Sequence, residues 1–234
     1  MQAVILAGGL GLRLRPITEL IPKPLINVNG KPFLEWQISF LKRYGFTDIV
    51  LLTGYLSEQI EKFLGNGSRF GVRIRYSRES TPLGTGGAIV QALQYLEDTF
   101  LLTYGDSFLP IDCAMVYNQL LQSKDLGLMV LYQDKFAETA VRPNIWLDEE
   151  SDYIRGYCKT GGGPFQYIDA GVSIFRKDAF RDRDDTAQVS LESGFLAKLI
   201  SEHKLRGYIS PHRFYDIGTF AGLEEMERFS TSFD

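Results

Sequence analysis

The stretch Met1–Leu14, MQAVILAGGLGLRL, gives the first indication of the fold class. It opens with an apolar run of strand length and continues directly into a glycine-rich loop that begins at Gly8. Strand-like and helix-like segments then alternate through the first half of the chain. Such alternation is typical of a mainly parallel sheet with helices on both faces. We therefore expect an α/β fold of the Rossmann-like, three-layer α/β/α type, with a mixed, mainly parallel central sheet.

Hydrophobic periodicity and turn residues give the expected elements. The predicted strands are Ala3–Ala7, Ile49–Thr53, Val72–Tyr76, Phe100–Tyr104, Leu126–Tyr132, Asn144–Leu147 and Tyr167–Phe175. The predicted helices are Pro32–Tyr44, Ser57–Gly65, Gly86–Leu96, Leu191–His203 and Phe220–Phe229. Pro32 suits a first helical turn, Ser57 suits an N-cap, and the acidic residues 148–152 suit a hairpin tip. With no internal repeat or low-complexity linker, we expect one domain over residues 1–234.

Composition excludes several classes of protein. A chain of 234 residues with 44% hydrophobic content can bury one large core. A net charge of −4 gives no sign of the positively charged surface that binds a nucleic acid backbone. No stretch approaches the roughly 20 apolar residues of a membrane span, and the first residues lack the features of a signal peptide. Cys113 and Cys158 have neither zinc-site nor redox spacing. We expect a soluble, cytoplasmic protein that binds neither nucleic acid nor a membrane.

The first glycine-rich loop suits a bound phosphate, because its backbone N–H groups are free of side-chain obstruction. A tight turn from a strand to a helix would also explain the glycines of this loop. A dinucleotide-binding fingerprint would need a third glycine where Leu14 stands. A P-loop would need Ser or Thr after Gly30-Lys31, where Pro32 stands. Neither of these two standard nucleotide motifs is present.

The charged residues after the loop are more specific. Arg13 ends the loop, and Lys23 lies between Pro22 and Pro24, which restrict the backbone around it. Here the sequence closely resembles the sugar-phosphate nucleotidyltransferase, or nucleotide-sugar pyrophosphorylase, family. Its signature G-G-x-G-x-R-L-x-P-x-T, followed by P-K-P, is matched over Gly8–Thr18 and Pro22–Pro24. Among short members, the chain resembles mannose-1-phosphate and D-glycero-D-manno-heptose 1-phosphate guanylyltransferases.

The resemblance implies an activity and a nucleotide site. The enzyme would join a sugar 1-phosphate to a nucleoside triphosphate, releasing pyrophosphate, in the biosynthesis of a nucleotide sugar. Arg13 and Lys23 would neutralise charge at the reacting phosphorus. The first loop would bind the nucleotide through Leu6, Ala7, Gly8, Gly9 and Gly11. The nucleotide-binding half would span about 1–110, and the half that binds the sugar phosphate about 111–234.

Two aspartates are the candidate metal ligands. Asp106 follows the apolar strand Phe100–Tyr104, and the carboxyl ends of such strands form the usual ligand crevice of an open α/β sheet. A carboxylate there suits Mg²⁺. Asp216, within Phe214–Thr219, resembles the second metal ligand in the late aspartate-x-glycine-threonine motif of the family. The expected cofactor is therefore Mg²⁺.

Further residues bear on base and sugar. The segment Thr81–Ala88 resembles the second nucleotide loop of the family, so Gly84 and Thr85 are candidate nucleotide contacts, and Glu79 falls at the base-recognising position. A carboxylate only accepts hydrogen bonds, and guanine offers two adjacent donors. Glu79 therefore favours GTP, although uracil, with one donor, stays open.

The sugar side of the site is implied by the resemblance alone. Lys159 matches the lysine that grips the sugar phosphate, and Asp169 and Gly171 match a sugar-binding Asn-Ala-Gly turn. Two departures leave the sugar open: Cys158 replaces an acidic residue of many relatives, and Asp169 replaces the asparagine. Heptose or mannose is the favoured sugar.

Three alternatives stay open. The enzyme could be a uridylyl-, cytidylyl- or thymidylyltransferase for another sugar 1-phosphate, such as that of N-acetylmuramic acid. The chain could be a non-catalytic nucleotide-sensing subunit, although such a subunit need not keep all four of Arg13, Lys23, Asp106 and Asp216. A glycosyltransferase would need an Asp-x-Asp motif, for which Asp182-Arg183-Asp184 is the nearest candidate. A homodimer is also left open, and His203 and His212 are expected at the surface.

Overall fold

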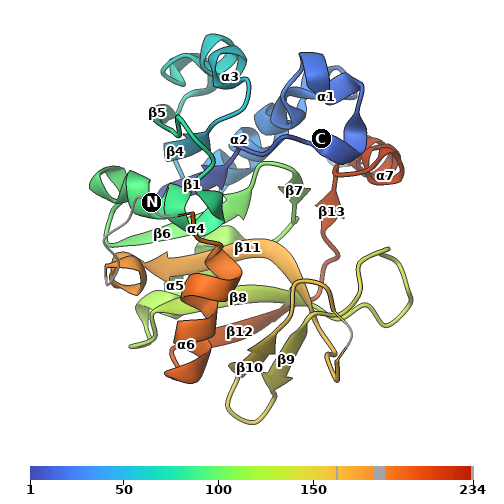
Figure 1. Ribbon diagram of the computed structural model, residues 1–234. Coiled ribbons are helices and arrows are strands. Elements are labelled where there is room, and N and C mark those ends of the chain that lie inside the picture. The colour runs from blue at the N-terminus through green and yellow to red at the C-terminus, as the bar shows by residue number, and fades with distance from the viewer. Residues whose placement is uncertain (162, 182–187, 233–234) are drawn as a thin grey trace. The chain divides into compact units, whose positions relative to one another are not determined.

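The computed structural model describes residues 1–161, 163–181 and 188–232 (Figure 1). Asp182-Arg183-Asp184 lies outside the described residues. The hydrogen-bonded strand order of the main sheet is β5-β4-β1-β6-β11-β8-β12-β10-β9. The chain divides into two compact units, and β6 (Thr99–Tyr104) contributes residues to both of them.

The first unit comprises Met1–Pro82, Thr103–Phe108 and Tyr215–Asp234. Its three long strands pair in parallel, in the order β5-β4-β1, and are β1 (Gln2–Leu6), β4 (Asp48–Thr53) and β5 (Arg73–Arg78). All six residues of β4 are buried, as expected for an inner parallel strand covered on both faces. The helices are α1 (Ile17–Leu20), α2 (Phe33–Arg43), α3 (Ser57–Leu64) and α7 (Phe220–Ser230).

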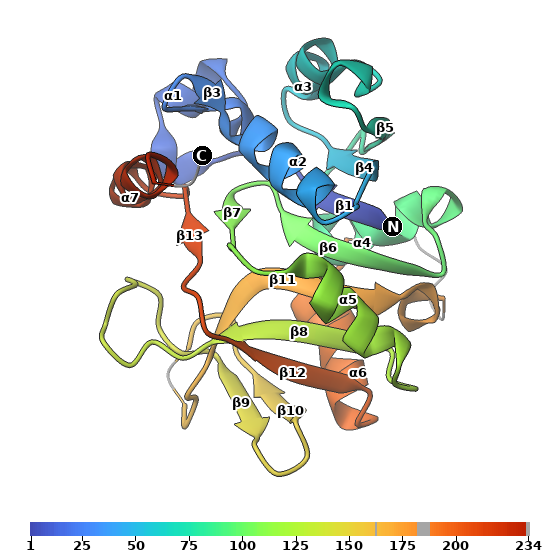
Figure 2. The ribbon, with the colours of Figure 1, turned by 180° about the vertical axis from the view of Figure 1, so that it is seen from behind.

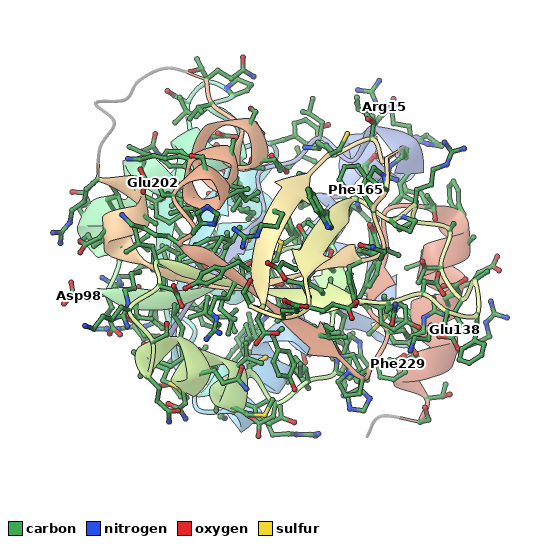
Figure 3. The ribbon with its side chains drawn as sticks, turned by 90° about the horizontal axis from the view of Figure 1, so that it is seen from below. Arg15, Asp98, Glu138, Phe165, Glu202 and Phe229 are labelled. Carbon is green, nitrogen blue, oxygen red and sulfur yellow. The ribbon has the colours of Figure 1, made fainter. Side chains whose placement is uncertain are left out.

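Two short antiparallel pairs complete this unit. One joins β2 (Asn27–Val28) to β3 (Lys31–Pro32). The other joins β7 (Ser107–Phe108) to β13 (Tyr215–Asp216), which lie side by side in Figure 2. Phe229 of α7 stacks on Tyr215 with ring centroids 4.2 Å apart, and it contacts Phe108 at 6.0 Å. This aromatic packing anchors β7 and β13 to the C-terminal helix (Phe229 is labelled in Figure 3).

The second unit comprises Leu83–Leu102 and Leu109–Phe214. Its strands are β8 (Gly127–Tyr132), β9 (Ile145–Asp148), β10 (Tyr153–Tyr157), β11 (Ile168–Arg176) and β12 (Leu205–Ser210). β8 and β12 are parallel, whereas the β11–β8, β12–β10 and β10–β9 pairs are antiparallel. The helices are α4 (Gly84–Ala92), α5 (Cys113–Leu121), the π-helix η6 (Leu191–Leu196) and α6 (Ala197–Ser201).

Packing in the second unit is dominated by aromatic side chains. Phe180 contacts Phe100, Phe175 and Phe195, with ring centroids 4.9–5.9 Å apart. Helix α5 covers β8 and β11 (Figure 2). Phe165 lies beside Gly156 of β10, where a Cβ would be 3.5 Å from its ring (Figure 3). The β9–β10 hairpin turns at residues 149–152, so the hairpin tip predicted for the acidic stretch is confirmed.

The predicted α/β fold with a mixed central sheet is confirmed, but three local predictions are wrong. Ser57 does not cap α3: it is the first helical residue, and its buried hydroxyl has no hydrogen-bond partner among the described residues. Pro32 pairs with Asn27 in the β2–β3 ladder and precedes the first turn of α2. The third helix begins at Gly84, before the predicted Gly86. The single domain over residues 1–234 stays a prediction.

Sequence reasoning also missed α5, β10 and β12. The two histidines lie at the surface, as predicted. No helix in the described ranges has the length and apolar character needed to cross a bilayer.

Candidate functional site

Lys23 contacts both predicted metal-ligand aspartates within the first unit. Its Nζ donates a hydrogen bond to Oδ2 of Asp106 and lies 4.0 Å from Oδ1 of Asp216. Lys23 is only 9% exposed, although it belongs to a residue type that is almost never buried without a partner. A 3₁₀ turn over Lys23–Leu25 holds its backbone between the two prolines. The structure thus brings together three candidate residues from distant parts of the sequence.

The two aspartates are held next to each other by backbone pairing. Asp216 pairs with Ser107 across the β13–β7 ladder, and the N–H of Ile217 donates to the carbonyl oxygen of Asp106 at 2.9 Å. The amide of Gln37, on α2, donates to the carbonyl oxygens of Tyr104 and Ser107 at 2.7 Å each. Gln37 therefore ties the loop that carries Asp106 to a buried helix.

Electrostatics at this pair favour a cation. Burial and the negative charge of Asp106 raise the pKa of Asp216, while the Lys23 ammonium opposes that shift. A carboxylate with a raised pKa is one whose negative charge is not fully compensated. Additional positive charge at this place would therefore be stabilised.

Gly218 leaves room for the charged side chains. A Cβ on Gly218 would lie 2.5 Å from Nη2 of Arg13, 2.5 Å from Oδ1 of Asp216 and 2.9 Å from Nζ of Lys23. The N–H of Gly218 also donates to Oδ1 of Asp216. Arg13 therefore reaches the same place as Lys23 and Asp216, and a side chain at position 218 would displace these charged groups.

The first glycine-rich loop lies against Glu79. A Cβ on Gly8 would be 2.9 Å from Oε1 of Glu79, and a Cβ on Gly54 would be 2.6 Å from it. Gly11 has a φ of +62°, which favours glycine, and packs on Thr18. Gly9 has no atom within 4 Å of its Cβ position. The backbone on one side of this loop is therefore open, as a phosphate-binding loop requires.

Leu6 and Ala7 lie just before this loop, and their role as nucleotide contacts stays a prediction. The carbonyl oxygen of Leu6 accepts from the N–H of Gly105 at 2.8 Å, and the N–H of Ala7 donates to the carbonyl oxygen of Leu52 at 2.8 Å. Both hydrogen bonds lie within the first unit, and the one from Gly105 to Leu6 holds Gly105 beside the loop.

The carboxylates of Asp106 and Asp216 suit a divalent cation such as Mg²⁺. No group of three or more His, Cys, Asp or Glu side chains that could enclose a metal occurs in residues 1–161, 163–181 and 188–232. Mg²⁺ is commonly bound by one or two carboxylates, with substrate phosphates and water completing its coordination. Asp106 and Asp216 match that donor set.

The second glycine-rich loop, residues 84–87, forms the first turn of α4 in the second unit. It packs on residues 189–192. The N–H groups of Gly86 and Gly87 donate to the carbonyl oxygen of Val189 at 2.9 and 3.2 Å. Gly84 has a φ of +74°, and a Cβ there would lie 2.6 Å from the same oxygen. These glycines are explained by close approach of another backbone segment.

The predicted sugar-phosphate residues also lie in the second unit. Nζ of Lys159 is 3.2 Å from Oε1 of Glu192. Oδ1 of Asp169 accepts from the N–H of Gly171 at 2.9 Å, and Gly171 adopts a φ of +78°. Burial, and then the negative charge of Glu192, raise the pKa of Asp169 to about 6.

The comparisons with known proteins identify the family. Residues 2–140 match the family model described as nucleotidyl transferase. The chain belongs to the nucleotidyl transferase family. The resemblance inferred from the Gly8–Thr18 motif, and the enzyme class that it implies, are thereby confirmed.

Individual relatives of this nucleotidyl transferase cover nearly all of it. It is 34% identical over 224 residues to D-glycero-alpha-D-manno-heptose 1-phosphate guanylyltransferase of Aneurinibacillus thermoaerophilus, with 93% of each chain covered. It is 32% identical to N-acetylmuramate alpha-1-phosphate uridylyltransferase of Neisseria meningitidis, with 97% of each covered. The structure of HddC from Yersinia pseudotuberculosis complexed with GMP-PN matches with a TM-score of 0.81 at 26% identity, covering 97% of this chain and 99% of that one.

Two residues of this nucleotidyl transferase were missed by sequence reasoning. Gly54 follows β4 and leaves the space that Glu79 fills. A glycine directly after a buried strand was the available signal. Glu192 contacts Lys159 and Thr85, at 3.2 and 3.4 Å. Nothing in its sequence neighbourhood distinguishes it from a solvated charge.

Asparagine at position 169 is expected to stabilise the nucleotidyl transferase near neutral pH. The pKa of Asp169 is raised from 3.8 to about 6, so the native state binds more protons than the unfolded state between these values. The contribution of Asp169 to the free energy of unfolding is therefore fully present below about pH 3.8 and is lost as the pH rises through 6. Asp169→Asn should add roughly 1–3 kcal/mol at pH 7.5 and little at pH 4.

Chemical denaturation of both proteins at the two pH values measures this difference. Asp178→Asn, at an exposed aspartate that pairs with Arg181, is the matched control and should not stabilise the protein. A stability gain for Asp169→Asn that is equal at pH 4 and pH 7.5 would contradict the prediction.

Proposed function

We propose that the protein is a sugar-1-phosphate guanylyltransferase, which makes a GDP-sugar and pyrophosphate from GTP and heptose or mannose 1-phosphate. The observation that carries this proposal is the contact of Lys23 with both Asp106 and Asp216 in the first unit. A buried lysine beside two carboxylates, with Arg13 close by, suits a polyanionic nucleotide and a metal ion. The relatives named as heptose 1-phosphate guanylyltransferases support the choice of substrates.

The reaction is a substitution at phosphorus. An oxygen of the sugar 1-phosphate forms a bond to the α-phosphorus of GTP, and the bond from that phosphorus to the oxygen bridging to the β-phosphorus breaks. The bonding electrons leave with pyrophosphate, and no proton transfer is needed. Both reactants are polyanions, so charge compensation and orientation are what the protein can supply.

The first unit supplies the positive charge for the triphosphate. In this proposal the loop of Gly8, Gly9 and Gly11, which is open at Gly9, binds phosphate oxygens through the backbone. Arg13 and Lys23 offset the negative charge that builds up at the α-phosphorus and on the leaving group. Because Lys23 is buried and fixed by its two prolines, its charge is in place before the substrates bind.

Nucleotidyltransferases generally depend on a divalent cation, and we propose Mg²⁺ held by Asp106 and Asp216. When bound, it would neutralise phosphate charge and polarise a phosphoryl oxygen. The raised pKa of Asp216 supports this assignment, since a cation would relieve the repulsion between the two carboxylates.

The second unit binds the sugar phosphate in this proposal. Lys159 carries a side chain that is 69% exposed, so its ammonium can reach a phosphate group. Asp169 and the backbone of Gly171 would bind sugar hydroxyls. Gly84 and Thr85 are proposed as nucleotide contacts, although Gly84 also packs on the backbone of Val189. The cytoplasmic location and a homodimer stay predictions.

Glu79 is expected to select guanine. Its carboxylate can accept from both N1–H and the 2-amino group, whereas a glutamine oxygen offers less charge and its amide donates. Glu79→Gln should lower kcat/KM for GTP by about 10-fold or more, and change kcat/KM for UTP less. The ratio of the two kcat/KM values measures the preference.

Glu58→Gln is the matched control, because Glu58 is exposed on α3 and pairs with Arg78. It should leave the GTP to UTP ratio unchanged. An unchanged ratio in Glu79→Gln would place base recognition elsewhere.

A matrix of sugar 1-phosphates and nucleotides, read by pyrophosphate release, tests the proposed function. Heptose or mannose 1-phosphate with GTP should give the highest kcat/KM. Turnover of N-acetylmuramic acid 1-phosphate with UTP instead would replace the proposed substrates by those of the uridylyltransferase relative. No pyrophosphate from any pair would contradict catalysis and favour a nucleotide-sensing role.

A further inference from the structure

Glu192 is a buried carboxylate with partners on both of its oxygens. It belongs to the first turn of η6 and is 8% exposed. Oε1 accepts from Lys159 at 3.2 Å, and Oε2 accepts from the hydroxyls of Ser190 and Thr85, the latter at 3.4 Å. Burial alone would raise the pKa of Glu192, but the Ser190 hydrogen bond and the Lys159 charge outweigh burial and lower it. The side chain is therefore ionised and held from two sides.

The segment around Glu192 is tied to the second glycine-rich loop by its backbone. The N–H of Leu191 donates to the hydroxyl of Thr85 at 2.8 Å, and the N–H of Val189 donates to the carbonyl oxygen of Leu83 at 2.9 Å. Phe195 fills the space beside Gly86, where a Cβ would lie 2.7 Å from its ring. The position of Glu192 is thus set by α4 and the loop that precedes it.

Lys159, unlike the buried Glu192, is mostly exposed. It lies in the turn after β10, and its flexible side chain is 69% exposed. A lysine in such a place samples many rotamers unless a partner holds it. Glu192 is the partner that the described residues provide for its ammonium group.

We propose that Glu192 is a positioning residue, which holds Lys159 for the sugar phosphate and links it to the second glycine-rich loop through Thr85. This inference rests on the proposed function, in which Lys159 binds that phosphate. Glu192 contacts no reacting atom and acts through Lys159. Its carboxylate keeps the ammonium aimed in one direction, so that the substrate phosphate meets an ordered partner.

Glu192→Gln tests the proposal, because glutamine keeps the size of the side chain and can still bond Ser190 and Thr85. KM for the sugar 1-phosphate should rise about 10-fold and kcat should fall, with KM for GTP within about 2-fold of the wild type. Glu202→Gln is the matched control: Glu202 pairs with Lys204 at 3.1 Å on the surface, and its substitution should change neither KM. A lower KM for the sugar 1-phosphate in Glu192→Gln would overturn the proposal, since Glu192 would then compete with the phosphate.

A double-mutant cycle with Lys159→Gln separates positioning from a structural role. If Glu192 acts through Lys159, adding Glu192→Gln to Lys159→Gln should change KM for the sugar 1-phosphate by less than about 2-fold. Effects that multiply would show that Glu192 acts independently of Lys159, and would overturn the inference.

Ser190→Ala provides a second variant, should Glu192→Gln fail to fold. It removes one of the hydroxyls that hold Glu192, and should raise KM for the sugar 1-phosphate about 3-fold with no further increase in the Lys159→Gln background. A KM equal to that of the wild type would count against the proposal. The wild-type protein is assayed first: an inactive wild type contradicts the proposed function, whereas an active wild type with multiplying effects contradicts only the role of Glu192.

Discussion

Replacing Lys23 by alanine is expected to lower kcat by about 100-fold or more while the fold survives. The ammonium of Lys23 lies between two carboxylates and is only 9% exposed, so its charge acts where water screens it weakly. Its backbone is also fixed before substrate binds, because Lys23 follows Pro22 and precedes Pro24 in a 3₁₀ turn. Alanine removes this preorganised charge, and no nearby solvent can restore it in the same geometry.

Steady-state pyrophosphate release at saturating GTP and sugar 1-phosphate measures this loss. Lys204→Ala, at a lysine that pairs with Glu202 on the surface, should keep the wild-type kcat. Circular dichroism and the melting temperature show whether Lys23→Ala remains folded. Arg13→Ala should give a similar loss, since Arg13 reaches the same place beside Gly218. Near-normal turnover in either variant would contradict the roles proposed for these cations.

Two members of the candidate cluster, Lys23 and Asp106, had positional reasons that the sequence shows. Asp106 follows a buried strand, and loops after parallel strands gather at one edge of a sheet. Lys23 lies between prolines, which is unusual for a surface lysine. Asp216 needed the family resemblance, because spacing in the sequence does not show that β13 returns to pair with β7. The structure places all three within one unit.

Other features depend on contacts that no local pattern records. The segment that holds Gly84 and Gly86 resembles a second nucleotide loop, yet the close neighbours of these glycines are Val189 and Phe195. Glu192 lies about a hundred residues from Thr85 and is selected by that packing. Ser57 has the residue type of an N-cap, but tertiary packing buries its hydroxyl inside the first turn of α3. Propensity and motif therefore locate many of the elements, although α5, β10 and β12 were missed, and they leave the contacts between distant segments open.

Asp106→Asn is expected to lower metal-dependent turnover by about 1,000-fold, which is close to abolishing it. Asparagine has nearly the same shape, and its oxygen can still accept a hydrogen bond from Lys23. It lacks the negative charge that a hard divalent cation requires. Burial and the charge of Asp106 raise the pKa of Asp216, and the substitution removes the second of these causes, so the variant should remain folded. The loss should therefore lie in metal binding and catalysis.

A titration of activity with Mg²⁺ distinguishes this outcome from a general loss of structure. Asp106→Asn should need more Mg²⁺ for half-maximal activity and should not regain the wild-type rate at saturation, whereas Asp178→Asn, at an exposed ion pair with Arg181, should follow the wild-type curve. Lys23 is hydrogen-bonded to Asp106, so Asp106→Asn and Lys23→Ala should not be independent, and the double variant should be less impaired than the product of the two losses. Full activity of Asp106→Asn at ordinary Mg²⁺ would place the metal elsewhere and leave Asp106 only as the partner of Lys23.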